Sequence, residues 1–176
     1  MFILIIGKPG SGKTTVGNLL SNGDNIGHFS YGQLLRDIQP NPPLEGYSTE
    51  DREKVDQLLI QASDAFTTII VDGNPYSKIG FGFLDRIEKF FNRVLVFHLL
   101  INDRQALARL EGRNREVSAH DGTSQKERID NFDQKILPLI QKYKEGHTIN
   151  EIDVSEMTTE QVARSIMSLS GDFTAR

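Results

Sequence analysis

The chain alternates short, almost continuous apolar runs with longer stretches in which apolar residues return every three or four positions. The runs at 2–6, 67–72 and 94–100 are typical of parallel strands that are buried on both faces. A short run at 27–30 and a segment at 148–153, where apolar and polar residues alternate, predict two further strands. The hydrophobic pattern therefore predicts five strands.

Helical spacing and capping residues predict helices between these strands. The first helix begins at about Lys13, and Ser48 with Asp51 forms a capping box before a helix whose apolar positions continue to Phe66. The remaining predicted helices are 83–91, a helix capped by Asn102, 123–145 with a kink at Pro138, and a helix capped by Thr158 with Gln161 that continues to Leu169. Strands that alternate with helices predict a three-layer α/β fold, and 176 residues suit a single domain.

Composition and charge limit the classes of function. A net charge of −4 argues against a surface that coats nucleic acid, and no apolar run reaches the roughly 20 residues of a membrane helix. Cysteine is absent, so disulfides and thiolate metal sites are excluded, and the 4 histidines show no zinc-ligand spacing. Because no basic leader precedes the first strand, we expect a cytoplasmic enzyme that binds neither nucleic acid nor membrane.

Residues 7–14 read Gly-Lys-Pro-Gly-Ser-Gly-Lys-Thr, which is a full G-x-x-x-x-G-K-[ST] phosphate-binding motif. The motif follows the first predicted strand directly, and a helix begins at its end, so the loop N–H groups and the helix N-terminus converge on one anion site. Lys13 can reach the outer phosphates of a nucleotide, and the Thr14 hydroxyl can ligate Mg²⁺. The motif predicts a nucleotide-binding site with magnesium.

Asp72 and several arginines are further candidates for phosphate chemistry. Asp72 ends the strand 67–72, at the edge where ligands bind in open α/β sheets, and can hold Mg²⁺ beside Thr14. Arg109 and Arg113 are four residues apart and hence share one helical face. Guanidinium groups can clamp the oxygens of a phosphoryl group during transfer. Other arginines in segments that flank the predicted site are Arg36, Arg115 and Arg128.

Together these motifs resemble the adenylate kinase family of nucleoside monophosphate kinases, and the resemblance extends from Met1 to about Leu169. The segments that carry it are 7–15, 28–36 (His-Phe-Ser-Tyr-Gly-Gln-Leu-Leu-Arg), 71–75 (Val-Asp-Gly-Asn-Pro), 109–113, 128–132, 137–143 and 152–162. The resemblance implies a P-loop kinase fold with a five-stranded parallel sheet flanked by helices. Its single domain would have a core (1–30 and 67–176), an acceptor-binding insert at about 31–66, and a short lid without zinc at about 113–123.

The resemblance also implies roles for individual residues. The catalytic residues would be Lys13, Arg113 and Arg128. The donor ATP would be bound by Gly10, Ser11, Gly12, Lys13, Thr14, Thr15 and, near the base, Arg109. The acceptor would be bound by Tyr31, Gly32, Arg36, Gly73 and Tyr76, and Mg²⁺ by Thr14 and Asp72.

The expected reaction is transfer of the γ-phosphoryl group of ATP–Mg²⁺ to a nucleoside monophosphate, a small-molecule nucleotide, by a monomeric enzyme. The chain departs from the family at the acceptor site, where Tyr76 replaces the usual arginine and Tyr31 the usual threonine. These departures leave two alternatives open. One is an ATP-binding module with little or no kinase turnover; the other is a kinase for a hydroxyl-bearing metabolite, with Asp37 or Asp72 as the base.

Overall fold

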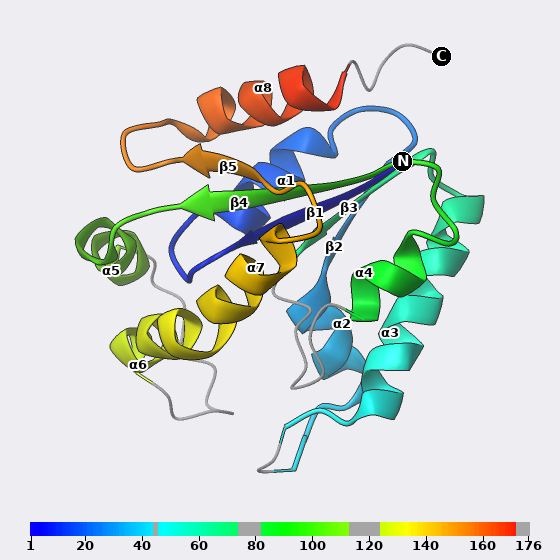
Figure 1. Cartoon of the computed structure of the whole chain (residues 1–176), viewed down its shortest axis with the longest axis horizontal. Coiled ribbons are helices and arrows are strands. Elements are labelled where there is room, and N and C mark those ends of the chain that lie inside the picture. Colours follow the sequence, from blue (N-terminus) through cyan, green and yellow to red (C-terminus); the bar gives the residue numbers. More distant parts are fainter. Residues whose placement is uncertain (44–45, 74–81, 113–123, 172–176) are drawn as a thin grey trace.

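The computed structural model describes residues 1–43, 46–73, 82–112 and 124–171. Its centre is a five-stranded sheet in the order β2-β3-β1-β4-β5, in which every neighbouring pair is parallel (Figure 1). The strands are β1 (Phe2–Gly7), β2 (Ile26–Ser30), β3 (Thr68–Asp72), β4 (Val94–Leu100) and β5 (Asn150–Asp153). All five lie where the hydrophobic pattern predicts strands, and the predicted α/β fold class is confirmed.

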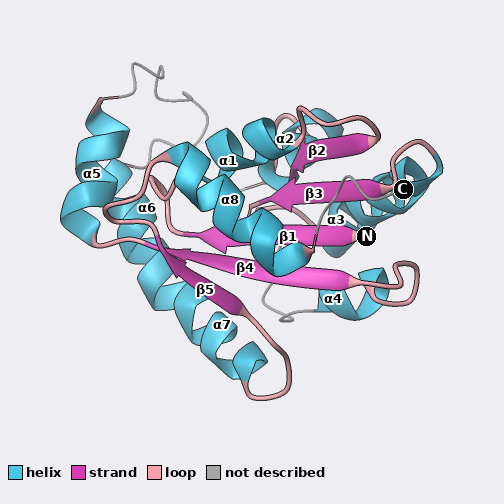
Figure 2. Ribbon diagram, turned by 90° about the horizontal axis from the view of Figure 1, so that it is seen from above, coloured by secondary structure: helices cyan, strands magenta, loops and turns pink. Residues whose placement is uncertain are grey.

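Helices cover both faces of this sheet. Those in the described residues are α1 (Lys13–Leu20), α2 (Tyr31–Ile38), α3 (Thr49–Gln61), the 3₁₀ turn η1 (Ala62–Asp64), α4 (Gly82–Ile87), α5 (Asp103–Glu111), α6 (Gln125–Asn131), the π-helical turn η2 (Phe132–Ile136), α7 (Leu137–Lys144) and α8 (Thr159–Ser170). Figure 2 shows α1 and α8 over one face and α3, α4 and α7 over the other. None of the described helices combines the length and the apolar composition that a membrane crossing requires.

The core consists of two apolar clusters, one on each face of the sheet. Alternate residues of β1 supply both, because Phe2, Leu4 and Ile6 belong to one cluster whereas Ile3 and Ile5 belong to the other. All five side chains are completely buried, and burial of each contributes about 1.5–3 kcal/mol. The strand that leads into the glycine-rich loop is therefore held firmly from both faces of the sheet.

The predicted helix caps are present. Ser48 and Asp51 form a capping box before α3, and Thr158 and Gln161 form another before α8. The Asn102 side chain accepts a hydrogen bond from the Gln105 N–H at 2.9 Å and so begins α5. These local signals set where helices start, as the sequence indicates.

The helix boundaries differ from prediction at two places. α4 ends at Ile87 instead of 91, because the Phe90 N–H donates to the Ile87 carbonyl in a tighter three-residue turn. The predicted helix at 123–145 is interrupted by η2, where the Leu137 N–H bonds the Phe132 carbonyl, one residue further back than in an α-helix. Pro138 follows directly and has no N–H to donate, so the wider turn accommodates it within the helix.

The strand order places a reversal of the chain's direction across the sheet at the C-terminal ends of β1 and β3. From β1 the chain continues to β2 at one edge of the sheet. From β3 it crosses in the opposite direction to β4, on the far side of β1. Such a reversal is the position where ligands bind in open parallel sheets. The glycine-rich loop follows β1 there, and Asp72 is the last residue of β3.

Candidate functional site

The glycine-rich loop folds as a turn that needs glycine at two positions. Gly10 has φ +85° and Gly12 has φ +90°, conformations that other residues rarely adopt. A Cβ atom on Gly10 would also lie 2.5 Å from the Ala106 carbonyl oxygen, so α5 packs directly against the loop. Gly12 immediately precedes α1 and provides no side-chain cap, which suits an anion at this helix N-terminus.

Ser11 provides a polar atom inside this loop. Its side chain is buried, and its hydroxyl oxygen has no hydrogen-bond partner among the described residues. A buried hydroxyl without a partner costs about 1–3 kcal/mol, and a phosphate oxygen would relieve that cost. The loop residues therefore fit a phosphate ligand on grounds that are independent of the motif.

Lys13 lies against the backbone of the same loop. Its ammonium group donates to the Gly7 carbonyl at 2.7 Å and to the Lys8 carbonyl at 3.1 Å. The Ser11 N–H donates to the same Lys8 carbonyl at 3.2 Å. The Lys8 carbonyl thus positions both the turn and the cation that the motif assigns to the outer phosphates.

Thr14 at the start of α1 contacts Asp72 at the end of β3, and their assignment to Mg²⁺ stays a prediction. The Thr14 hydroxyl donates to Oδ1 of Asp72 at 3.1 Å, and Asp72 is 3% exposed. The Ser30 hydroxyl approaches the same oxygen at 3.5 Å, and β2 and β3 place Ser30 and Asp72 opposite each other. A hydroxyl and a carboxylate in contact are hard oxygen ligands that suit Mg²⁺.

His28 completes this group, and its contact with Asp72 was not predicted from the sequence. His28 Nε2 lies 2.8 Å from Oδ2 of Asp72, and His28 Nδ1 lies 2.8 Å from Oδ1 of Asn18 in α1. An ionised carboxylate only accepts, so Nε2 is the donor to Asp72. A Cβ atom on Gly17 would lie 2.3 Å from Nε2, so the imidazole occupies space that glycine leaves open in α1. The available signal was the period of two in β2, which puts His28 on the same face as Ser30.

A pocket begins at the N-terminus of α1. It has a volume of about 370 Å³, and its lining includes Ser11, Gly12, Thr15, Arg109, Val154 and Met157. The Arg109 guanidinium is half-buried and donates to the Val154 carbonyl at 2.8 Å and the Ser155 carbonyl at 3.3 Å. Arg109 therefore borders a pocket that opens beside the phosphate loop, and its assignment to the donor base stays a prediction.

Three of the predicted acceptor residues, Tyr31, Gly32 and Gly73, lie at the ends of β2 and β3. A Cβ atom on Gly73 would lie 3.1 Å from Cβ of Tyr31 and 3.8 Å from the Gly32 nitrogen, so these three residues are brought together. Tyr31 is 2% exposed, and its hydroxyl lies 3.5 Å from Asp56 of α3. Arg36 is on the exposed side of α2, where it donates to Gln33 at 2.9 Å.

The remaining predicted site residues are not all described. Arg128 is an exposed residue in the last turn of α6. Arg113 and Tyr76 lie outside the described residues, as do Arg115 and the predicted lid. The assignments of Arg113, Arg128 and Tyr76 to catalysis and acceptor binding stay predictions.

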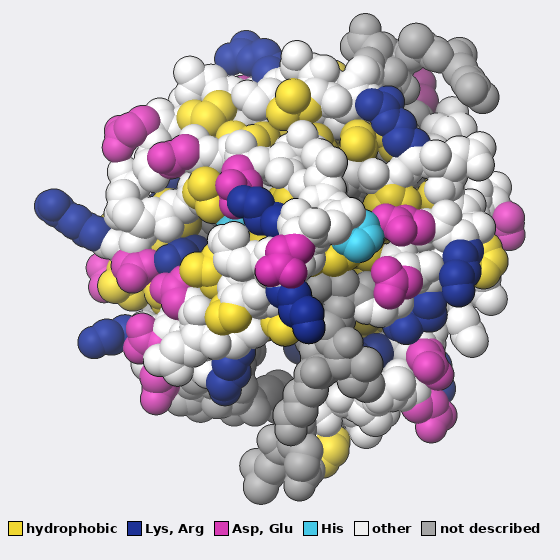
Figure 3. Space-filling model, viewed as in Figure 1, with side chains coloured by type: hydrophobic (Ala, Val, Ile, Leu, Met, Phe, Trp, Pro, Cys, Tyr) yellow, Lys and Arg dark blue, Asp and Glu magenta, His cyan; other side chains and the backbone are white. Residues whose placement is uncertain are grey.

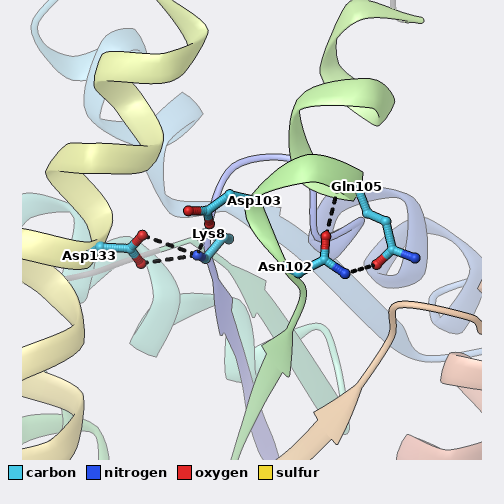
Figure 4. Close-up of polar contacts among 5 residues, drawn as sticks. All are labelled: Lys8, Asn102, Asp103, Gln105 and Asp133. Carbon is cyan, nitrogen blue, oxygen red and sulfur yellow. Dashed lines mark hydrogen bonds and ion pairs between the residues drawn. The ribbon is translucent and has the colours of Figure 1, made fainter.

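Three further charged residues at the loop were not singled out from the sequence. Lys8 donates to Asp103 at the start of α5 and to Asp133 in η2, as Figure 4 shows. No spacing rule pairs residues that are 95 and 125 positions apart, so this ion triad becomes visible only in three dimensions. The position of Lys8 inside the motif was the only available hint.

The surface carries charges of both signs. On the face shown in Figure 3, acidic and basic side chains are interspersed rather than gathered into a patch of one sign.

The site combines a glycine-rich loop between a buried strand and a helix, a lysine, and a Thr–Asp pair where the strand connections of a parallel sheet reverse direction. These features define a P-loop nucleotide-binding protein. Comparison with known families agrees, since the AAA domain family matches residues 6–128. The chain belongs to this family.

Individual proteins refine the comparison. The chain is 27% identical to an adenylate kinase of Borrelia recurrentis over 96% of both chains. It is 30% identical to an adenylate kinase of Wolinella succinogenes over 64% of this chain and 67% of that protein. Among solved structures, the tunicamycin resistance protein of Deinococcus radiodurans matches with a TM-score of 0.65 and 17% identity over 99% and 98% of the two chains, which shows a shared fold. The predicted resemblance is confirmed, and the chain is nucleotide kinase-like.

Proposed function

We propose that this protein transfers the γ-phosphoryl group of ATP to a nucleoside monophosphate. The observation that carries the proposal is the convergence, at the ends of β1 and β3, of the Lys13 loop with the Thr14–Asp72 pair. The loop offers donors for a polyphosphate, and the pair offers oxygen ligands for Mg²⁺ beside it. ATP–Mg²⁺ is a ligand that would use both the loop donors and the oxygen ligands of the pair.

The donor would lie across the loop, with its base toward Arg109. The pocket of about 370 Å³ beside α1 has the polar and apolar lining that a nucleoside needs, from Thr15 and Arg109 to Val154 and Met157. Thr14 and Asp72 would hold Mg²⁺, which neutralises charge on the phosphate oxygens. Lys13 supplies a cation from the protein for the same charge.

The acceptor would approach from the ends of β2 and β3, where Tyr31, Gly32 and Gly73 lie together. A bond would form between an acceptor phosphate oxygen and the γ-phosphorus, while the bond from the γ-phosphorus to the bridging oxygen of ADP breaks. An anionic acceptor oxygen carries no proton to remove, so no general base is required. Arg36, Arg113 and Arg128 are the proposed cations for the acceptor and the transferring group.

The test is an ADP-release assay with ATP–Mg²⁺ and each of AMP, CMP, GMP, UMP and dTMP. We expect ADP formation that depends on one or more of these acceptors, and its loss by at least about 100-fold in Lys13→Met. Lys54→Met is the matched control, because Lys54 is exposed on α3 and pairs only with the exposed Glu50 in the described structure. ATP binding without turnover on any acceptor would instead favour the ATP-binding module, and full activity of Lys13→Met would overturn the site.

A further inference from the structure

Lys8 joins the phosphate loop to two helical segments that are distant in sequence. Its ammonium nitrogen lies 2.5 Å from Oδ1 of Asp103, and 3.1 and 3.2 Å from the two carboxylate oxygens of Asp133 (Figure 4). The lysine side chain is 14% exposed, against 58% for Asp103 and 31% for Asp133. An ammonium group has three protons, and three carboxylate oxygens surround this one.

The triad differs from an ordinary surface ion pair because its lysine is largely shielded from water. Burial alone lowers the pKa of Lys8, but the hydrogen bonds and charges of Asp103 and Asp133 outweigh it, and the net shift is upward. Loss of Lys8 would leave two carboxylates facing each other beside the loop. Both carboxylates are partly exposed, so water offsets part of the cost of losing their common partner, and Asp133 at 31% exposure bears more of that cost than Asp103 at 58%.

The backbone of Lys8 positions the phosphate-binding groups. Its carbonyl accepts from the Lys13 ammonium at 3.1 Å and from the Ser11 N–H at 3.2 Å. The side chain of the same residue is fixed by α5 and η2. A displacement of Lys8 would therefore move the Lys13 cation and the turn together.

Both α5 and η2 contact the phosphate loop near Lys8. The Ala106 carbonyl of α5 lies against Gly10, three residues after the Asp103 that binds Lys8. Asp133 belongs to η2, the widened turn that precedes Pro138, and it also lines a cavity of about 330 Å³ with Lys8, His98 and Phe132. The loop is thus held from two sides, by α5 through Gly10 and Lys8 and by η2 through Lys8.

We propose that Lys8 is a positioning residue for the phosphate loop, and that its triad with Asp103 and Asp133 couples nucleotide binding to the placement of α5 and η2. The inference rests on the proposed function, with ATP as donor. Coupling is reciprocal, so ATP should stabilise the helices by the same factor by which the triad strengthens ATP binding. Energetic coupling of this kind amounts to about fivefold or more in affinity.

The experiment measures ATP binding by calorimetry and hydrogen exchange in the full chain. We expect Lys8→Met to weaken ATP binding at least about fivefold and to remove the extra protection that ATP gives to the amides of α5 and η2. Lys8→Arg, which keeps the charge, should retain most of the affinity. Asp133→Asn should weaken binding, and adding it to Lys8→Met should cause no further loss, because the interaction is already absent.

A charge exchange separates positioning from mere support of the fold. Lys8→Asp alone places a third carboxylate in the cluster and should abolish measurable coupling, whereas Lys8→Asp combined with Asp133→Lys restores the charges and should recover ATP affinity. Lys54→Met, which breaks the exposed Lys54–Glu50 pair, is the matched control and should change neither readout. If wild-type protein binds ATP and Lys8→Met binds it within twofold as tightly, the inference is wrong and the proposed function stands. If wild-type protein binds no triphosphate, the proposed function fails and this inference fails with it.

Discussion

Thr14 and Asp72 are 58 residues apart in the chain, yet the threonine hydroxyl donates to the carboxylate across 3.1 Å. The contact joins the start of α1 to the end of β3, at the point where the connections between strands reverse direction across the sheet. His28 holds the second carboxylate oxygen at 2.8 Å, so the orientation of Asp72 is fixed from two sides. Two oxygen atoms are therefore held in place beside the phosphate loop, and the proposed Mg²⁺ site would need little further ordering.

Asp72→Asn tests this preorganised pair directly. The amide keeps the size of the side chain but removes the negative charge, so we expect activity with ATP–Mg²⁺ to fall at least about 100-fold. The Mg²⁺ concentration for half-maximal activity should rise, whereas binding of metal-free ATP should not weaken. Mg²⁺ titrations of turnover and of ATP binding measure both. Asp64→Asn, at an exposed position in η1, is the control. An unchanged Mg²⁺ dependence in Asp72→Asn would contradict the assignment.

Gly17→Ala should destabilise the protein although alanine is the better helix former. In an ordinary helix interior this change stabilises by about 1 kcal/mol. Here the new methyl group would lie 2.3 Å from His28 Nε2, and the imidazole is held by Asn18 and Asp72. We expect a net loss of about 1–3 kcal/mol in the free energy of unfolding, measured by urea denaturation.

The companion variants identify the cause of that loss. In a His28→Ala background the methyl group meets no ring, so Gly17→Ala should be neutral or stabilising there. Gly146→Ala is the steric control, because a Cβ atom on Gly146 has no described atom within 4 Å. An equal loss with and without the His28 ring would show that the contact is not responsible.

Arg86→Met should destabilise the protein, because Arg86 is the cation that pairs with the buried Asp56 carboxylate. Asp56 is 2% exposed, Arg86 binds it through two nitrogens, one of them Nε at 2.8 Å, and burial raises the pKa of Asp56 despite this partner. Without the guanidinium the carboxylate is left shielded and without its cation, so we expect a loss of about 3 kcal/mol in the free energy of unfolding. The double variant Arg86→Met with Asp56→Leu should recover much of it. A double variant no more stable than Arg86→Met would refute the explanation by an unpaired charge.

The parts of this structure that follow from local signals were predictable from sequence. Apolar runs give the five strands, and Ser48, Asn102 and Thr158 give the helix starts, because each depends on neighbours within four residues. The loop with Lys13 was predictable for the same reason, since its chemistry is contained in one contiguous motif.

The rest depends on which distant segments meet. Lys8 faces Asp103 and Asp133, and His28 faces Asp72, only because the strand order brings their elements together. α2 is eight residues long and was not predicted, and η2 arises where Pro138 meets a helix that packing holds in place. Local patterns carry no information on such pairs, so the supporting residues around the site are found from three-dimensional contacts.

His98 should make stability fall as the pH drops below about 6.5, the usual pKa of histidine. Burial lowers the pKa of His98, and its contact with Glu151 at 3.4 Å opposes only part of that shift. Between the two pKa values the unfolded chain binds a proton at His98 that the folded protein does not bind. The stabilisation from neutral His98 is therefore fully present above the unfolded pKa and is lost as the pH falls toward the lower folded pKa, by at most about 1.4 kcal/mol per pH unit. Urea unfolding between pH 7.5 and 5.5 should show this slope in wild-type protein and a flatter profile in His98→Gln. Equal slopes in the wild-type protein and in His98→Gln would show that His98 is not the group responsible.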